Sequence, residues 1–208
     1  MADIKSLARD ERQALADFLA TLSPSQWDVR TLCTEWTVRQ LVAHVVSYED
    51  LDRRALVRRF AEGRFLPGKI NAVGVAEAGG LEPDELLAKL RMCVDPRGFT
   101  TGLGGRIALV DGMIHHQDIR RPLGLPREIP AERLLPALSF AMKAPPIRAF
   151  WRARGLRLVA TDLDWSSGRG PEVRGAGEAI MMAAAGRRGV VGELTGPGQP
   201  TLARRLGG

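Results

Sequence analysis

The chain has 208 residues, 45% hydrophobic and 26% charged, the balance of a soluble globular protein with one large domain or two small ones. No apolar run approaches the ~20 residues of a membrane-spanning helix, and the first residues lack the pattern of a secretory signal, so we expect a cytoplasmic protein without a membrane partner. The net charge of +6 arises mainly in residues 145–208. The arginines there are not interleaved with aromatic residues on which bases could stack, so we do not expect a nucleic-acid partner.

The first third of the chain predicts two helices and a loop. Apolar residues recur at helical spacing over Asp3–Thr21, which predicts the first helix. Thr37 followed by Gln40 has the pattern of a capping box, so the second helix is predicted to run from Thr37 to about Ala61. The stretch Phe65–Gly80 is rich in glycine and small residues and is predicted to be a loop.

Three further helices follow, each bounded by proline or glycine. They are predicted over Asp84–Val94, Arg106–Arg121 and Pro130–Met142. Pro145-Pro146 then marks the predicted boundary between a helical domain over residues 1–145 and a small α/β domain over residues 146–208.

The pattern of apolar and polar residues changes after that boundary. Leu156–Trp165 alternates between apolar and polar residues, which predicts a strand followed by a turn at residues 166–168. Gly175–Ala185 predicts a short helix, and Val190–Thr195 predicts a second strand. The expected fold class is therefore α+β, with helices first and a compact α/β tail.

Two of the three histidines occupy informative positions. His44 lies in the middle of the second predicted helix, between apolar residues. Asp111 and His115 lie four residues apart in a later helix, so their side chains face the same side. One carboxylate and two imidazoles could together bind a divalent metal such as zinc and leave a position for water or substrate, as in catalytic zinc sites.

The same pattern also fits a protein without a metal. A histidine on an apolar helix face is more often a hydrogen-bonded core residue than a ligand, and an Asp–His pair at this spacing is a common interaction. His116 lies about 100° around the helix from His115, so we expect it to face solvent or to support the site from outside the ligand set. Asp118 is expected either to hold a ring nitrogen of His115 or to pair with Arg121 on the surface.

Three segments together resemble one known family. Residues 33–44, CTEWTVRQLVAH, and residues 111–124, DGMIHHQDIRRPLG, look like two signatures of the mycothiol-dependent maleylpyruvate isomerase-like family. Residues 175–198 are similar to the small sterol-carrier-like domain that often follows. The resemblance implies a DinB-like four-helix bundle and then a small α/β domain.

The resemblance also implies a metal site and a cosubstrate. A divalent metal, usually zinc, would be bound by His44, Asp111 and His115. The acidic position is commonly glutamate in the family and is the shorter aspartate here, which puts metal identity and occupancy in question. Mycothiol is the implied thiol, and we expect Arg39 and Arg106 among the residues that contact it.

A metal with an open position would favour the thiolate form of mycothiol, which could then attack an electrophilic small molecule. The expected function is thus a metal-dependent mycothiol transferase or isomerase. Cys33 and Cys93 are far apart, are expected to be free thiols and are not needed as nucleophiles. The alternatives are a hydrolase, lyase or cyclase that uses metal-bound water, and a non-catalytic small-molecule-binding protein. The protein could be a monomer or a homodimer.

Overall fold

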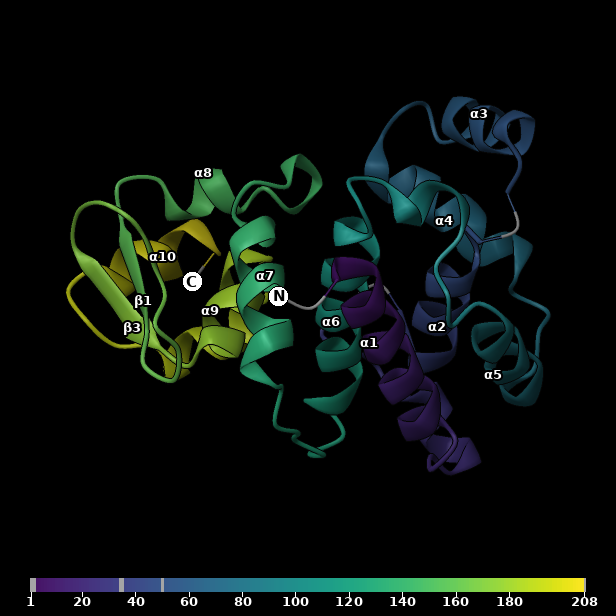
Figure 1. The fold of residues 1–208 in the computed structure, drawn as a ribbon, viewed down its shortest axis with the longest axis horizontal. Helices are drawn as coiled ribbons and strands as arrows, with labels where there is room; N and C mark the ends of the chain where they lie inside the picture. The colour runs from purple at the N-terminus through teal and green to yellow at the C-terminus, as the bar shows by residue number, and fades with distance from the viewer. Residues whose placement is uncertain (1–2, 34–35, 50, 208) are drawn as a thin grey trace. The chain divides into compact units, whose positions relative to one another are not determined.

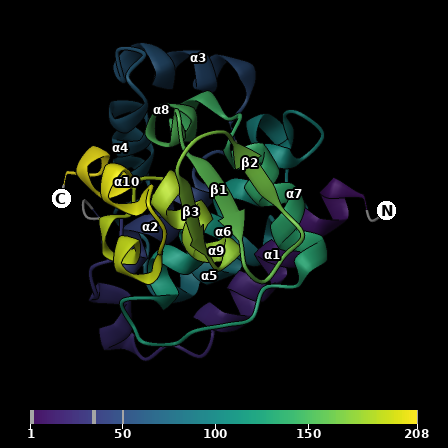
Figure 2. The same cartoon turned by 90° about the vertical axis from the view of Figure 1, so that its left-hand side faces the viewer.

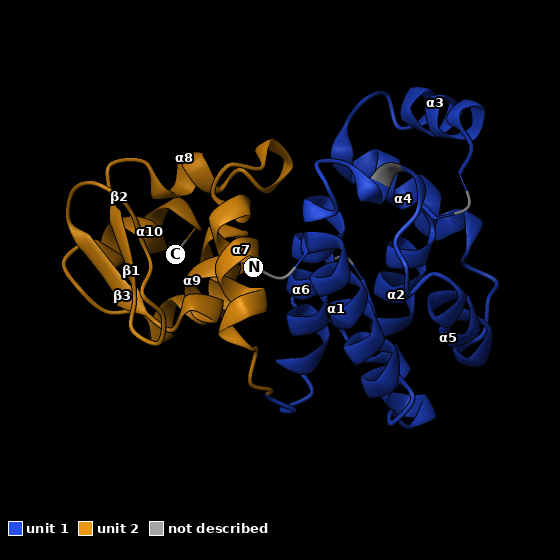
Figure 3. Ribbon diagram, viewed as in Figure 1, with its two compact units in different colours: residues 1–126 blue, residues 127–208 orange. Residues whose placement is uncertain are grey.

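The computed structural model describes residues 3–33, 36–49 and 51–207. The chain forms two compact units, residues 1–126 and residues 127–208 (Figure 3). Each unit is described by itself below.

The first unit is helical. Four of its helices, α1, α2, α5 and α6, pack against one another as a bundle, and α3 and α4 follow α2 and pack on each other (Figure 1). The bounds are α1 Ile4–Leu19, α2 Val38–Val46, α3 Arg53–Glu62, α4 Pro67–Glu77, α5 Pro83–Met92 and α6 Arg106–Arg120, with 3-10 turns at Pro24–Asp28 and Gly98–Thr101.

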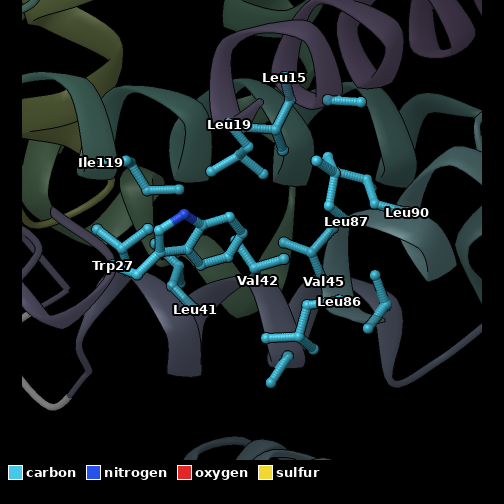
Figure 4. Close-up of a cluster of buried hydrophobic side chains, with 14 of the residues drawn as sticks. Leu15, Leu19, Trp27, Leu41, Val42, Val45, Leu86, Leu87, Leu90 and Ile119 are labelled. Atoms are coloured by element: carbon cyan, nitrogen blue, oxygen red, sulfur yellow. The ribbon is translucent and has the colours of Figure 1, made fainter. Parts of the chain in front are cut away.

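The bundle is held by apolar side chains that each helix presents on one face. Burial of such side chains stabilises the unit by roughly 1.5–3 kcal/mol apiece. Figure 4 shows the centre of this core, where all four bundle helices meet. The labelled residues are Leu15, Leu19, Trp27, Leu41, Val42, Val45, Leu86, Leu87, Leu90 and Ile119.

The start of α2 follows the predicted capping box. The backbone N–H of Gln40 donates to Thr37 Oγ1, and the backbone N–H of Thr37 donates to Gln40 Oε1 at 3.0 Å. These bonds satisfy two N–H groups that the first helical turn leaves without partners. The prediction of a helix start at Thr37 is confirmed.

The prediction of one continuous helix from there to about Ala61 is wrong. After α2 the hydroxyl of Ser47 donates back to the carbonyl of His44 at 2.9 Å, which competes with continuation of the helix. α3 then starts from its own cap, where the backbone N–H of Ala55 donates to Asp52 Oδ1 at 2.7 Å.

The predicted loop over Phe65–Gly80 is also wrong, because the segment contains α4. Pro67 occupies the first helical position, where its missing N–H costs nothing. One of its glycines serves close packing, because a Cβ atom at Gly74 would come within 2.6 Å of Ser47 Oγ. A composition typical of loops therefore marks a helix that approaches α2 closely.

The second unit combines helices with a small mixed sheet. The strand order is β2-β1-β3, with β1 antiparallel to β2 and parallel to β3, and α9 packs on β1 and β3 (Figure 2). The bounds are α7 Ala131–Ala141, α8 Ala149–Ala153, β1 Arg157–Ala160, β2 Ser166–Gly168, β3 Glu172–Gly175, α9 Gly177–Ala184 and α10 Gln199–Arg205, with 3-10 turns at Pro145–Ile147 and Arg188–Glu193.

The α+β fold class is confirmed, but the strand predictions are only partly right. Residues 166–168, predicted as a turn, form β2, and β3 was not predicted. Residues 190–195, predicted as a strand, mostly form a 3-10 turn, and only Thr195 makes a bridge, with Arg174.

The predicted domain boundary at residues 145 and 146 falls after α7, whereas the compact units divide before it, because α7 packs against α9. Within the described residues, no helix has the length and apolar character to cross a bilayer.

Candidate metal centre

His44 is a buried histidine in the middle of α2. Three aromatic rings surround its imidazole. Trp36 lies on it with ring centroids 4.9 Å apart and a tilt of 32°, while His115 and Tyr48 approach it edge-on, with centroids at 5.1 and 5.8 Å. The imidazole is therefore fixed in an aromatic setting with one ring nitrogen toward α6.

Asp111 and His115 lie one turn apart on α6 and face His44, as their spacing predicts. Asp111 Oδ1 lies 3.4 Å from His115 Nε2 and 4.0 Å from His44 Nε2. One potential ligand atom from each of the three residues lies within 4.8 Å of the other two. The fold thus brings together the three residues that the sequence analysis singled out.

The three side chains differ in exposure, which gives the cluster a direction. The side chains of His44 and His115 are 5% and 10% exposed, whereas that of Asp111 is 36% exposed. The imidazoles therefore form the buried side of the cluster, and the carboxylate forms the side that solvent reaches.

Asp118 supports His115 from behind. Its carboxylate is fully buried and lies 3.0 Å from His115 Nδ1. A hydrogen bond at Nδ1 leaves Nε2, the nitrogen facing Asp111, as the nitrogen available to a ligand. Asp118 thus takes the first of the two positions that the sequence allowed, against a ring nitrogen of His115, and it is buried rather than on the surface.

The charges of the cluster set its protonation. Burial lowers the pKa of His44 from 6.5 to about 4, against the attraction of Asp111. Burial also disfavours charge on His115, but the carboxylates of Asp111 and Asp118 outweigh it and raise the pKa of His115 to about 9. Burial would raise the pKa of Asp111, yet the facing imidazoles hold it below its usual range. At neutral pH His44 is thus neutral, the form that could bind a metal, and His115 would have to release a proton for a metal to bind.

His116 lies outside this cluster. Its side chain is fully buried, so the expectation that it faces solvent is wrong. Its Nδ1 lies 3.0 Å from Glu11 Oε1, and its Nε2 accepts a hydrogen bond from Arg120 at 2.8 Å. The contact with Glu11 ties α6 to α1, and a supporting role of His116 toward the ligand set stays a prediction.

The two arginines expected to contact a cosubstrate make hydrogen bonds to residues outside the cluster. Arg39 donates to Glu82 at 3.0 Å and lies, with Trp36, along a groove of about 570 Å³ between α2 and α4. Arg106 is exposed and donates to the carbonyl of Leu103 at 3.0 Å. Their role toward a cosubstrate stays a prediction.

Sequence reasoning did not single out Trp36 and Tyr48, the two aromatic residues beside His44. Tyr48 follows His44 by four residues, a spacing that places both on one face, and its hydroxyl donates to Asn71 Oδ1 at 2.6 Å. Trp36 precedes the helix cap, and no periodicity rule applies to a residue outside the helix. The spacing of Tyr48 was a usable signal, whereas the position of Trp36 was not.

Comparison with known proteins gives a consistent result. Residues 8–99 match the family model described as the mycothiol maleylpyruvate isomerase N-terminal domain. A crystal structure of a mycothiol-dependent maleylpyruvate isomerase matches with a TM-score of 0.56 at 18% sequence identity, over 93% of this chain and 91% of that chain. A histidine-to-alanine mutant of such an isomerase matches with a TM-score of 0.56 at 17% identity, over the same shares. No curated protein matches. At these identities the structural likeness establishes a shared fold.

Proposed function

Because residues 8–99 match the family model of the mycothiol maleylpyruvate isomerase N-terminal domain, we propose that this protein is a metal-dependent enzyme that uses mycothiol to attack an electrophilic small molecule. The reaction class is thiol transfer or isomerisation. The observation that carries the proposal is the convergence of His44, Asp111 and His115 from two helices of the bundle.

The donor set fits a divalent metal. Two imidazole nitrogens and one carboxylate oxygen form the ligand chemistry of many catalytic zinc sites. With ligand distances of ~2.0–2.2 Å, two ligand atoms on one tetrahedral zinc lie about 3.3 Å apart. The observed 3.4 and 4.0 Å from Asp111 Oδ1 to the two Nε2 atoms are close to that spacing.

The residues of the site would divide the work. When bound, the metal would lower the pKa of a coordinated thiol and so favour its thiolate. His44 and His115 would hold the ion from the buried side, and Asp118 would keep the His115 ring in the orientation that coordination needs. The partly exposed side of Asp111 would admit the thiol and the electrophile.

Removal of one proposed ligand tests whether the protein binds metal at this site. Substituting His44→Ala removes one of three ligands, so purified variant protein is expected to contain less than a tenth of the zinc of the wild type. The measurement is elemental analysis of both proteins. The control is Gln13→Ala, on an exposed part of α1, which is expected to keep the metal. Equal metal content in wild type and His44→Ala would contradict the metal site.

Turnover separates the proposed reaction from its alternatives. The metal-loaded protein would be assayed with maleylpyruvate and with chlorodinitrobenzene, with and without mycothiol. We expect conversion of one of them that requires mycothiol and is absent in His44→Ala. Metal-dependent hydrolysis without a thiol would indicate the hydrolase, lyase or cyclase class. Binding of mycothiol without turnover would indicate a binding protein.

A further inference from the structure

The two histidines of the cluster are oriented in different ways. The ring of His115 is held by a hydrogen bond from its Nδ1 to the buried carboxylate of Asp118. His44 Nδ1 is buried and has no hydrogen-bond partner among the described residues. A ligand imidazole normally depends on such a partner to aim its other nitrogen at the metal. Another device must fix the ring of His44.

The ring packing around His44 supplies that device. Trp36 is the nearest ring and the only one of its three aromatic neighbours, among described residues, that lies on it at a small tilt. An indole stacked at 4.9 Å blocks rotation of the imidazole about its χ2 angle on that side. The ring of His115 also approaches His44, edge-on at 5.1 Å between centroids.

The backbone fixes Trp36 itself. Its carbonyl accepts hydrogen bonds from Thr31 N at 3.0 Å and from Thr31 Oγ1 at 2.9 Å, and its N–H donates to the carbonyl of Cys33 at 2.9 Å. The N–H of Leu32 donates to the carbonyl of Asp118 at 3.0 Å. The segment that carries Trp36 is thus tied to the residue of α6 that holds the ring of His115.

We propose that Trp36 is the positioning residue of His44. The indole face of Trp36 aims His44 Nε2 at the ion, and it does so in place of a hydrogen bond such as the one that orients His115. This inference rests on the proposed metal site. It extends that site to Trp36, which lies before α2 and is not itself one of the three proposed ligands. Trp36 also lines the groove between α2 and α4, so a molecule in that groove would contact the residue that aims a ligand.

The test compares Trp36→Leu and Trp36→Phe with the wild type. Leucine keeps apolar bulk but removes the aromatic face, so we expect the zinc affinity to fall about 10–100-fold, the range for loss of a residue that orients a ligand. Phenylalanine keeps a ring face, and we expect an affinity within a few-fold of the wild type. The measurement is zinc competition against a chromophoric chelator, with the cobalt absorption spectrum as a second readout of ligand geometry.

Trp27→Leu is the matched control. Trp27 lies in the bundle core and has no ring contact with His44, so its loss should lower stability without changing zinc affinity or the cobalt spectrum (Figure 4). Affinity unchanged in Trp36→Leu, with a metal-binding wild type, would overturn the positioning role alone. A wild type that binds neither zinc nor cobalt would overturn the metal site and this inference together.

If Trp36→Leu folds poorly, a measurement on metal-free protein still tests the stacking of Trp36 on His44. The chain has three histidines, so their ring protons can be assigned by NMR. In the metal-free wild type, the His44 ring protons should be shifted upfield by the Trp36 ring current, and Trp36→Phe should reduce that shift. An unshifted His44 resonance in the wild type would overturn the stacked arrangement.

Discussion

At the scale of the residue, the candidate site depends on side chains that touch the ligands as much as on the ligands. The spacing of Asp111 and His115 on one helix was readable from the sequence because both lie in one regular element. Their meeting with His44 required the packing of α2 on α6, which no local pattern encodes. The spacing of Asp118 allowed a contact with His115 as one of two alternatives, whereas Trp36 lies outside any helix and had no periodicity to reveal it.

Asp118→Asn tests the support behind His115. The amide keeps the shape but loses the negative charge that favours the Nδ1–H tautomer, so zinc affinity should fall about 10–100-fold. Competition with a chromophoric chelator measures it. Asp17→Asn, an exposed change on α1, should leave affinity unchanged. An Asp118→Asn protein with wild-type affinity would remove Asp118 from the account of the site.

Tyr48 gives a pH prediction. Burial, opposed by Arg59, raises the pKa of Tyr48 from 10.0 to about 12. Because the folded protein holds the phenolic proton more tightly than the unfolded chain, this contribution to stability is complete below pH 10 and is lost as the pH rises toward 12. Tyr48 is the single tyrosine, so phenolate absorbance during an alkaline titration reports it directly. Ionisation near pH 10 in folded protein would contradict the shift.

At the scale of the element, the helices of the bundle were predicted well and the segment after His44 was not. Caps and apolar periodicity are local, so α1, α5 and α6 lie close to their predicted bounds. The small residues of α4 have the composition of a loop, and only the close contact of Gly74 with α2 explains them. The strand β3 was missed because its alternation spans four residues only, and its pairing with β1 is a contact with a separate segment of the chain.

Gly74→Val tests that close contact. A Cβ atom at this position would lie 2.6 Å from Ser47 Oγ and 3.0 Å from an Arg59 guanidinium nitrogen, so a branched side chain should destabilise the protein by about 1–3 kcal/mol. Chemical denaturation measures the change in the free energy of unfolding. The control is Gly68→Ala in the same helix, where a Cβ meets no atom within 4 Å and the change should be neutral or slightly stabilising. Equal effects at the two positions would show that α4 does not pack closely on α2.

At the scale of the whole molecule, the two units carry different charge. Residues 1–126 have 17 Lys+Arg and 17 Asp+Glu, whereas residues 127–208 have 13 and 7. The whole net charge of +6 therefore belongs to the second unit, while the three proposed ligands and the bundle core belong to the first. General attraction of anions is a property of the second unit, and specific metal binding is proposed for the first.

Metal binding should raise the thermal stability of the protein. A ligand that binds only the folded state at about 100 times its Kd adds about 2.7 kcal/mol, which corresponds to a rise in Tm of several degrees for a chain of this size. Thermal unfolding of chelator-treated protein with and without added zinc measures the rise. His44→Ala should show none. A zinc-induced rise of equal size in that variant would place the stabilising ion elsewhere.

The unequal exposure of the three donors has a kinetic consequence. Asp111 is the most exposed of the three donors, so a cosubstrate that lay against it would cover the part of the proposed site that solvent reaches. A cosubstrate bound there would shield the ion, so it should slow removal of the metal by a chelator. The rate at which a chelator removes the metal therefore reports whether a cosubstrate is bound beside Asp111.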